Sequence, residues 1–183
     1  MASGSIARTE APTARAAIAA GEPPPIPRSG KIRIGWRGLL LLLTLVVLVP
    51  LHHLYRFVSY GSPFPKLFLF LAARIIGARV TLYGTPLRRD VFFISNHVSW
   101  VDILALAGAS GTAFVAKAEL GRVPVIGWLC RLNRTVFVSR EDRGGVADQI
   151  NRLREAFADN WSVTVFPEGT TTDGQSLLPF KSS

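Results

Sequence analysis

A histidine and an aspartate lie five residues apart at the end of a short apolar run, in the sequence Asn96-His97-Val98-Ser99-Trp100-Val101-Asp102. The preceding residues, Val91 to Ile94, are β-branched and aromatic, which predicts a buried strand. The residues after Ser99 predict an apolar helix that Ser99 can cap. His97 would then lie just outside the helix N-terminus and Asp102 one turn inside it. The carboxylate could accept a hydrogen bond from one ring nitrogen and leave the other nitrogen free as a general base.

The same pair has a simpler interpretation. His97 can be a polar residue at a strand end, and Asp102 an acid in the first helical turn that complements the helix dipole. The catalytic interpretation needs no serine or cysteine nucleophile if the substrate brings its own hydroxyl. Support for the catalytic interpretation has to come from polar residues elsewhere in the chain.

Short apolar runs alternate with helical patterns over the second part of the chain. The predicted strands cover 80–83, 91–94, 112–116, 135–138 and 163–166. The predicted helices run from Trp100 to about Ala107, from Pro124 to about Leu132, and over Val146 to Phe157. This alternation predicts an α/β fold with a mostly parallel sheet flanked by helices, in which sites form at the carboxyl ends of strands. Four polar residues directly follow predicted strands and could converge on that edge: His97, Lys117, Arg140 and Glu168.

The N-terminal part has a different composition. Residues 1–30 are rich in alanine, proline, serine and glycine, which is typical of a disordered tail. An apolar run of 14 residues, Gly38 to Leu51, follows. As a helix it would measure roughly 21 Å, against a hydrocarbon core of about 30 Å. With the amphipathic segment Phe64 to Ile76, it predicts a membrane-anchoring helical segment over 31–78, either a hairpin in one leaflet or a single span.

Composition narrows the range of partners. Hydrophobic residues make up 49% of the chain and the net charge is +9, which points to an anionic membrane surface. Basic clusters interleaved with aromatic residues are lacking, so nucleic acid is not an expected partner. The basic residues before the apolar run favour a cytoplasmic N-terminus. Cys130, the single cysteine, excludes an internal disulfide and is expected as a packed thiol, and His52 and His53 as interfacial polar residues rather than metal ligands.

Three sequence blocks occur in a recognisable order. They are Asn-His-x-x-x-x-Asp at 96–102, Val-Phe-Val-Ser-Arg at 136–140, and Phe-Pro-Glu-Gly-Thr at 166–170, with Lys117 to Leu120, Pro124 and Gly127 before the second and Leu178 to Lys181 after the third. From about Arg33 onward the chain therefore resembles the membrane glycerolipid acyltransferases related to 1-acyl-glycerol-3-phosphate acyltransferase. The region 79–183 would be the acyltransferase domain.

The resemblance implies transfer of an acyl group from acyl-CoA or acyl-ACP to the free hydroxyl of 1-acyl-glycerol-3-phosphate, which makes phosphatidate. His97 would deprotonate the hydroxyl, and Asp102 would orient the imidazole. The thioester is a co-substrate, and no metal or redox cofactor is implied. The expected location is the cytoplasmic membrane, with the active site on the cytoplasmic side.

The remaining site residues would hold the lysolipid acceptor. Glu168, Gly169 and Thr170 match the block assigned to acceptor binding, and Lys117 and Arg140 are the expected anion ligands, Arg140 because its planar fork can pair with phosphate. Each has an alternative role. Arg140 can pair with a neighbouring acid, Lys117 can extend toward lipid head groups, and Glu168 can cap a helix.

Two departures from the family pattern bear on the acceptor and the fold. Many members that use glycerol-phosphate acceptors have arginine at the position of Thr171, so its absence strengthens an alternative acceptor such as lyso-ornithine lipid. Family members also continue beyond Lys181-Ser182-Ser183, so the C-terminal part of the domain is expected to be missing.

Two other functions compete with acyl transfer. A hydrolase would use His97 to activate water and would have to exclude alcohol from the site. A non-enzymatic membrane scaffold would tolerate alanine at position 97.

Overall fold

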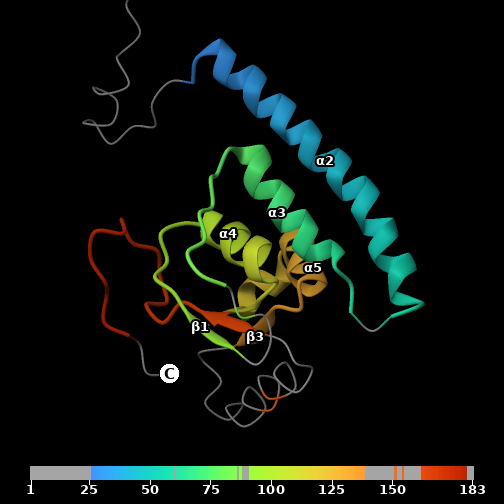
Figure 1. Cartoon of the computed structure of the whole chain (residues 1–183). Coiled ribbons are helices and arrows are strands. Elements are labelled where there is room, and N and C mark those ends of the chain that lie inside the picture. Colours follow the sequence, from blue (N-terminus) through green and yellow to red (C-terminus); the bar gives the residue numbers. More distant parts are fainter. Residues whose placement is uncertain are drawn as a thin grey trace, which may run out of the picture. The chain divides into compact units, whose positions relative to one another are not determined.

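The computed structural model describes residues 26–59, 61–85, 87, 91–138, 151, 154 and 162–180 (Figure 1). The elements are, in order, α2 (Arg28–Arg56), α3 (Phe64–Ile76), β1 (Phe92–Ile94), α4 (Val101–Ser110), β2 (Ala113–Lys117), the 3₁₀ helix η1 (Ala118–Arg122), α5 (Pro124–Leu132), β3 (Val136–Val138) and β4 (Val163–Val165). The chain divides into two units, residues 1–39 and 40–183. In the first unit, the described residues from Arg28 onward form the start of α2.

The four described strands form one parallel sheet in the order β1-β4-β2-β3. β4 is the last of them in the sequence, yet it lies between β1 and β2, with Val163 paired with both Phe92 and Ala113. The carboxyl ends of β1, β4 and β2 are therefore neighbours at one edge of the sheet. The predicted α/β fold with a parallel sheet is confirmed.

Helices α3, α4 and α5 lie on one side of this sheet (Figure 1). Small buried residues allow α3 and α4 to approach closely, among them Ala72, Ala73 and Ala107. A Cβ atom added at Gly108 would lie 2.8 Å from the Cα of Phe70, so the two helix backbones are in direct contact there. Such a contact leaves no room for a side chain.

Both apolar N-terminal segments are helical, as the sequence predicts. The run from Gly38 to Leu51 lies inside α2, a helix of 29 residues that is long and apolar enough to cross a membrane by length and composition. α2 is longer than the apolar run because each flanking residue extends an existing helix, which is far easier than starting one. α3 ends at Gly77, whose φ of 94° is the left-handed conformation that glycine adopts readily.

Three predictions need comment. The strand predicted at 80–83 is wrong: these residues are not in a strand, and Tyr83 is 95% exposed. Alternating apolar residues fit a pleated surface, but they form a strand only where a partner strand is available. His52, predicted as an interfacial polar residue, has its ring buried in the protein, with its Nδ1 2.9 Å from Ser62 Oγ. Most of the helix predicted over 146–157 lies outside the described residues.

Candidate active site

The turn between β1 and α4 brings His97 and Asp102 together. Nδ1 of His97 lies 2.9 Å from Oδ2 of Asp102, and the two side chains are 19% and 25% exposed. An ionised carboxylate can only accept hydrogen bonds, so Nδ1 carries the hydrogen. Nε2 then holds a lone pair that can take a proton from a bound hydroxyl.

The same carboxylate oxygen holds the turn in place. Oδ2 of Asp102 also accepts hydrogen bonds from the backbone N–H groups of Val98 (2.7 Å) and Ser99 (2.9 Å). Partial burial opposes ionisation of Asp102, but the hydrogen bonds from Ser99, His97 and Val98 outweigh it and hold the pKa of this carboxyl below its usual value. Asp102 is therefore ionised at neutral pH.

The predicted helix cap is displaced by one residue. Trp100 occupies the N-cap position and its side chain makes no capping hydrogen bond. The hydroxyl of Ser99 still accepts a hydrogen bond from the N–H of Val101 at 3.2 Å, so Ser99 stabilises the first helical residue from outside the helix.

The imidazole of His97 is stacked on an aromatic ring that sequence reasoning did not assign to the site. The ring centroids of His97 and Phe166 are 4.1 Å apart with 19° between their planes, and Phe166 in turn stacks on Phe114 at 5.8 Å and 8°. The three rings come from the ends of β1 and β4 and from within β2. Stacking restricts rotation of the imidazole, which leaves Nε2 pointing in one direction.

The segment after β4 also contacts the backbone of His97. The N–H of Thr172 donates a hydrogen bond to the carbonyl oxygen of His97 at 2.8 Å. The threonine run 170–172 offers backbone and hydroxyl donors, but the sequence does not indicate that the backbone of His97 accepts from one of them. Because the two residues are 75 positions apart, only the strand order would have revealed the contact.

Glu168 points into the protein at the same edge. It is 0% exposed, and its Oε2 accepts one long hydrogen bond, 3.4 Å, from the N–H of Leu178. No described residue donates to Oε1. Leu178 is not in a helix, so the alternative role as a helix cap is not seen here. A buried carboxylate oxygen without a donor costs free energy, which a hydroxyl from a ligand would recover.

The structure describes three of the four other residues that the sequence predicts for acceptor binding. Gly169 has a φ of 67° and donates its N–H to the carbonyl of Phe166, and this turn directs Glu168 inward. Thr170 is exposed. Lys117 ends β2 and is exposed, two strands away from β1, or about 10 Å at about 4.8 Å per strand. Arg140 lies outside the described residues.

An apolar cavity of about 410 Å³ adjoins the site. Residues of α2, α3, α4 and α5 line it, including Trp100, directly before α4, and Ile103. Cys130 lines it too, and burial raises the pKa of its thiol, with a hydrogen bond to Thr135 and the charge of Arg131 acting weakly against this. The cavity can hold an aliphatic chain close to the turn that carries His97.

Comparisons with known proteins agree with the motifs. A family model described as Acyltransferase matches residues 79–183. The chain is 36% identical over 155 residues to the lyso-ornithine lipid O-acyltransferase of Rhizobium meliloti (strain 1021), covering 83% of this chain and 53% of that protein. It is 37% identical over 114 residues to the 1-acyl-sn-glycerol-3-phosphate acyltransferase of Neisseria gonorrhoeae, covering 62% of this chain and 44% of that protein.

A solved structure is also similar. The 1-acyl-sn-glycerophosphate (LPA) acyltransferase PlsC from Thermotoga maritima aligns with a TM-score of 0.52 at 26% identity, covering 80% of this chain and 67% of that chain. The chain spans between 53% and 63% of the length of three lyso-ornithine lipid O-acyltransferases that it matches.

Proposed function

Because the chain belongs to the acyltransferase family, we propose that the whole protein transfers a fatty acyl group from a thioester to the free hydroxyl of a lysolipid. The observation that carries the proposal is the His97–Asp102 pair, held at 2.9 Å with Nε2 of His97 left for the substrate. A base with an orienting carboxylate is sufficient for this reaction, since the acceptor alcohol is itself the nucleophile.

The reaction follows from the roles of these groups. The acceptor hydroxyl donates its proton to Nε2 of His97 while its oxygen attacks the thioester carbonyl carbon. Asp102 stabilises the imidazolium that forms. The carbonyl then re-forms as the C–S bond breaks, and the leaving thiolate takes up the proton, which regenerates neutral His97. No covalent acyl-enzyme is formed.

Glu168 contributes to acceptor binding in this scheme. Its Oε1 lacks a donor among the described residues and would accept a hydrogen bond from a hydroxyl or amide of the acceptor head group. Gly169, Thr170 and Lys117 would be further acceptor ligands, as would Arg140, which lies outside the described residues. The apolar cavity would receive an acyl chain.

For the acceptor, we place lyso-ornithine lipid ahead of lysophosphatidate. Thr171, an exposed residue, occupies the position where an arginine would supply one more cation for a phosphate. Three relatives named lyso-ornithine lipid O-acyltransferase match over 83% to 89% of the chain and a fourth over 55%, against 62% for the relative named 1-acyl-sn-glycerol-3-phosphate acyltransferase. Lysophosphatidate is the second candidate because that relative is equally similar in sequence where it aligns.

Helix α2 and the net charge of +9 support a membrane location, and we propose the cytoplasmic membrane with the active site on the cytoplasmic side. The donor would be acyl-CoA or acyl-ACP.

The test is acyl transfer in membranes that contain the full protein, with a labelled acyl thioester and either lyso-ornithine lipid or lysophosphatidate. We expect turnover of lyso-ornithine lipid and its loss in His97→Ala. Turnover of lysophosphatidate alone would reverse the order of the two acceptors. Full turnover in His97→Ala, or none in the wild type with either acceptor, would contradict the proposal.

A further inference from the structure

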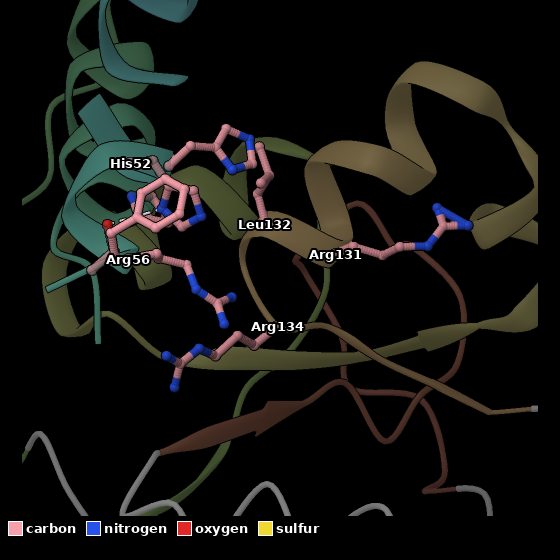
Figure 2. A pocket seen from close by; sticks show the side chains of 9 residues that line it. His52, Arg56, Arg131, Leu132 and Arg134 are labelled. Carbon is pink, nitrogen blue, oxygen red and sulfur yellow. Dashed lines mark hydrogen bonds between the residues drawn. The ribbon is translucent and has the colours of Figure 1, made fainter. Parts of the chain in front are cut away.

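Basic side chains, among them Arg56 and Arg134, line a cavity of about 300 Å³ at the edge of the sheet opposite to His97 (Figure 2). The ends of α2 and α5 and the start of α3 form it, and Arg134 lies two residues before β3. All strands of a parallel sheet begin at the same edge, so this is the amino edge, whereas His97 follows the carboxyl end of β1. Groups that position the base have to come from the carboxyl edge.

One peptide group at the carboxyl edge is held at both of its ends. It joins His97 to Val98, and it contains the carbonyl of the first residue and the N–H of the second. The N–H donates a hydrogen bond to Oδ2 of Asp102 at 2.7 Å, and the carbonyl accepts one from the N–H of Thr172 at 2.8 Å. Because a peptide group is planar, the two hydrogen bonds together oppose its rotation. They fix the ψ angle of His97, and therefore the position of its side chain relative to α4.

The hydroxyl of Thr172 supports this contact. Its oxygen lies 3.5 Å from the carbonyl oxygen of His97 and accepts a hydrogen bond from the N–H of Gly174 at 3.3 Å. Asp173, between the two loop residues, is exposed, and its carboxylate accepts a hydrogen bond from the N–H of Gln175. The hydroxyl of Thr172 thus stabilises the loop conformation that directs the N–H of Thr172 at His97.

Gly174 lies against the side chain of Val98. Its φ is 75°, in the left-handed region that glycine adopts readily. A Cβ atom added there would lie 3.1 Å from Cγ2 of Val98, which is closer than the usual 3.5–4.0 Å between carbon atoms. A side chain at this position would therefore strain the backbone and push the loop away from the turn that carries His97. Gly84 has a similar φ of 82°, but a Cβ atom there would meet no described atom within 4 Å.

The same loop begins and ends at the carboxylate assigned to acceptor binding. Glu168 is buried three residues after β4, and its Oε2 accepts a hydrogen bond from the N–H of Leu178. The chain therefore leaves Glu168, contacts His97 through Thr172, and returns to Glu168 at Leu178. A loop of this kind fixes the acceptor site and the base relative to one another, which transfer to a bound alcohol requires.

We propose that Thr172 and Gly174 are positioning residues for the base. Thr172 holds the peptide group that follows His97, and Gly174 lets the loop close on Val98. Both act through His97, by keeping its Nε2 directed at the acceptor hydroxyl. The inference rests on the proposed acyl transfer, since it gives these two residues a role in that reaction.

The experiment measures steady-state acyl transfer by the full protein in membranes, for Gly174→Ala and its matched control Gly84→Ala. Both variants place alanine in a left-handed conformation, but only Gly174→Ala directs the strain at the catalytic turn. We expect Gly174→Ala to lower kcat about tenfold and to change the KM of the acceptor less than about twofold, because misplaced groups slow the reaction of the bound complex. Gly84→Ala should keep the kcat of the wild type.

Thr172 provides a milder test. Thr172→Val keeps the N–H but removes the hydroxyl, and should lower kcat about threefold, whereas Thr172→Ser keeps the hydroxyl and should restore the rate. Hydrogen exchange reports the contact without turnover. The N–H of Thr172 should be protected in the wild type and should exchange about tenfold faster in Gly174→Ala, but not in Gly84→Ala. A thermal unfolding curve for each variant separates these effects from loss of folding.

Four outcomes would overturn this inference alone, while acyl transfer by the wild type and its loss in His97→Ala remain. They are a wild-type kcat in Gly174→Ala, an equal loss in Gly84→Ala, a raised acceptor KM at unchanged kcat, and rapid exchange of the Thr172 N–H in the wild type. The third would show that the loop acts on acceptor binding and not on the base. Absence of turnover in the wild type would overturn the proposed function and this inference together.

Discussion

The two edges of the parallel sheet hold their charged groups in opposite ways. At the carboxyl edge, the single oxygen Oδ2 of Asp102 accepts three hydrogen bonds, and the charge is balanced by donors within one turn. At the amino edge, Arg56 and Arg134 share a cavity whose lining contains no acidic residue. The first arrangement pairs opposite charges before a substrate arrives, whereas the second gathers basic side chains in one cavity.

This difference separates two kinds of site. Groups that are already paired and oriented can act on a reaction without reorganising, which is the main requirement of a general base. Basic groups that line a cavity have no such requirement, because they act through the charge that they gather there. Substitutions at the carboxyl edge should therefore change rate constants, and substitutions at the amino edge should change stability.

The largest expected effect is that of Asp102→Asn, which we predict lowers kcat by roughly 10³-fold to 10⁴-fold with little change in KM. The amide can turn its NH₂ group toward Nδ1 of His97, which places the hydrogen on Nε2 and removes the base. Steady-state acyl transfer measures this, with Asp173→Asn as the control because that exposed carboxylate accepts a local hydrogen bond from the N–H of Gln175. A decrease of less than tenfold would mean that Asp102 does not orient the base.

The next effect concerns the aromatic stack behind the base. Phe166→Leu should lower kcat by about tenfold, because a stacked pair is worth about 0.5–1.5 kcal/mol and its loss frees the imidazole to rotate. Phe166→Tyr should restore the rate, and the pH profile of kcat should change in the leucine variant alone. Phe114→Leu, which contacts Phe166 and not His97 in the stack, is the control. Equal losses in Phe114→Leu and Phe166→Leu would indicate general packing rather than positioning.

A smaller effect is expected at the amino edge. In neutral detergent, Arg56→Gln should raise Tm by about 1–2 °C, because it removes repulsion between Arg56 and the other basic residues that line the cavity. Added salt should raise the Tm of the wild type more than that of the variant, since salt screens the same repulsion. Differential scanning fluorimetry over a salt series measures both. A lower Tm in the variant at every salt concentration would mean that these charges are already balanced in the protein.

The smallest effect concerns the apolar cavity that is lined by α2, α3, α4 and α5. Burial raises the pKa of the Cys130 thiol, so less of the reactive thiolate is present at pH 8 than in an exposed cysteine. Alkylation by iodoacetamide should be about tenfold slower in the folded protein than in denaturant, and should accelerate as the pH rises toward the raised pKa. Mass spectrometry of quenched samples measures the rate. An equal rate in both states would show that water and reagent enter the cavity freely.

The features that the sequence predicts correctly depend on residues that are close to one another along the chain. The hydrogen bond between His97 and Asp102 spans five residues and needs only a turn and the first turn of a helix. Strand composition likewise located β1 to β4 to within two residues at each end. The parallel arrangement followed from the alternation of strands with helices, because parallel strands require a crossover between them.

Features that depend on strand order were not predictable. Phe166 contacts His97 because β4 lies next to β1, and nothing in the composition of either strand selects that neighbour. The hydrogen bond from Thr172 to His97 depends on the same pairing. The error at 80–83 has a related cause, because an alternating pattern describes a side-chain surface and does not reveal whether a partner strand exists. The burial of His52 similarly depends on Ser62, ten residues away across a turn.

The position of β4 has a consequence for how the protein is made. As the chain emerges from the ribosome, β1, β2 and β3 are available long before residues 163–165, which complete the middle of the sheet. Until then β1 and β2 each lack an inner neighbour and expose backbone groups that can pair with other chains. Closing that gap requires contacts between distant residues, which form slowly. Insertion of β4 would therefore be the late step that turns an aggregation-prone nascent chain into a protein with an assembled active site.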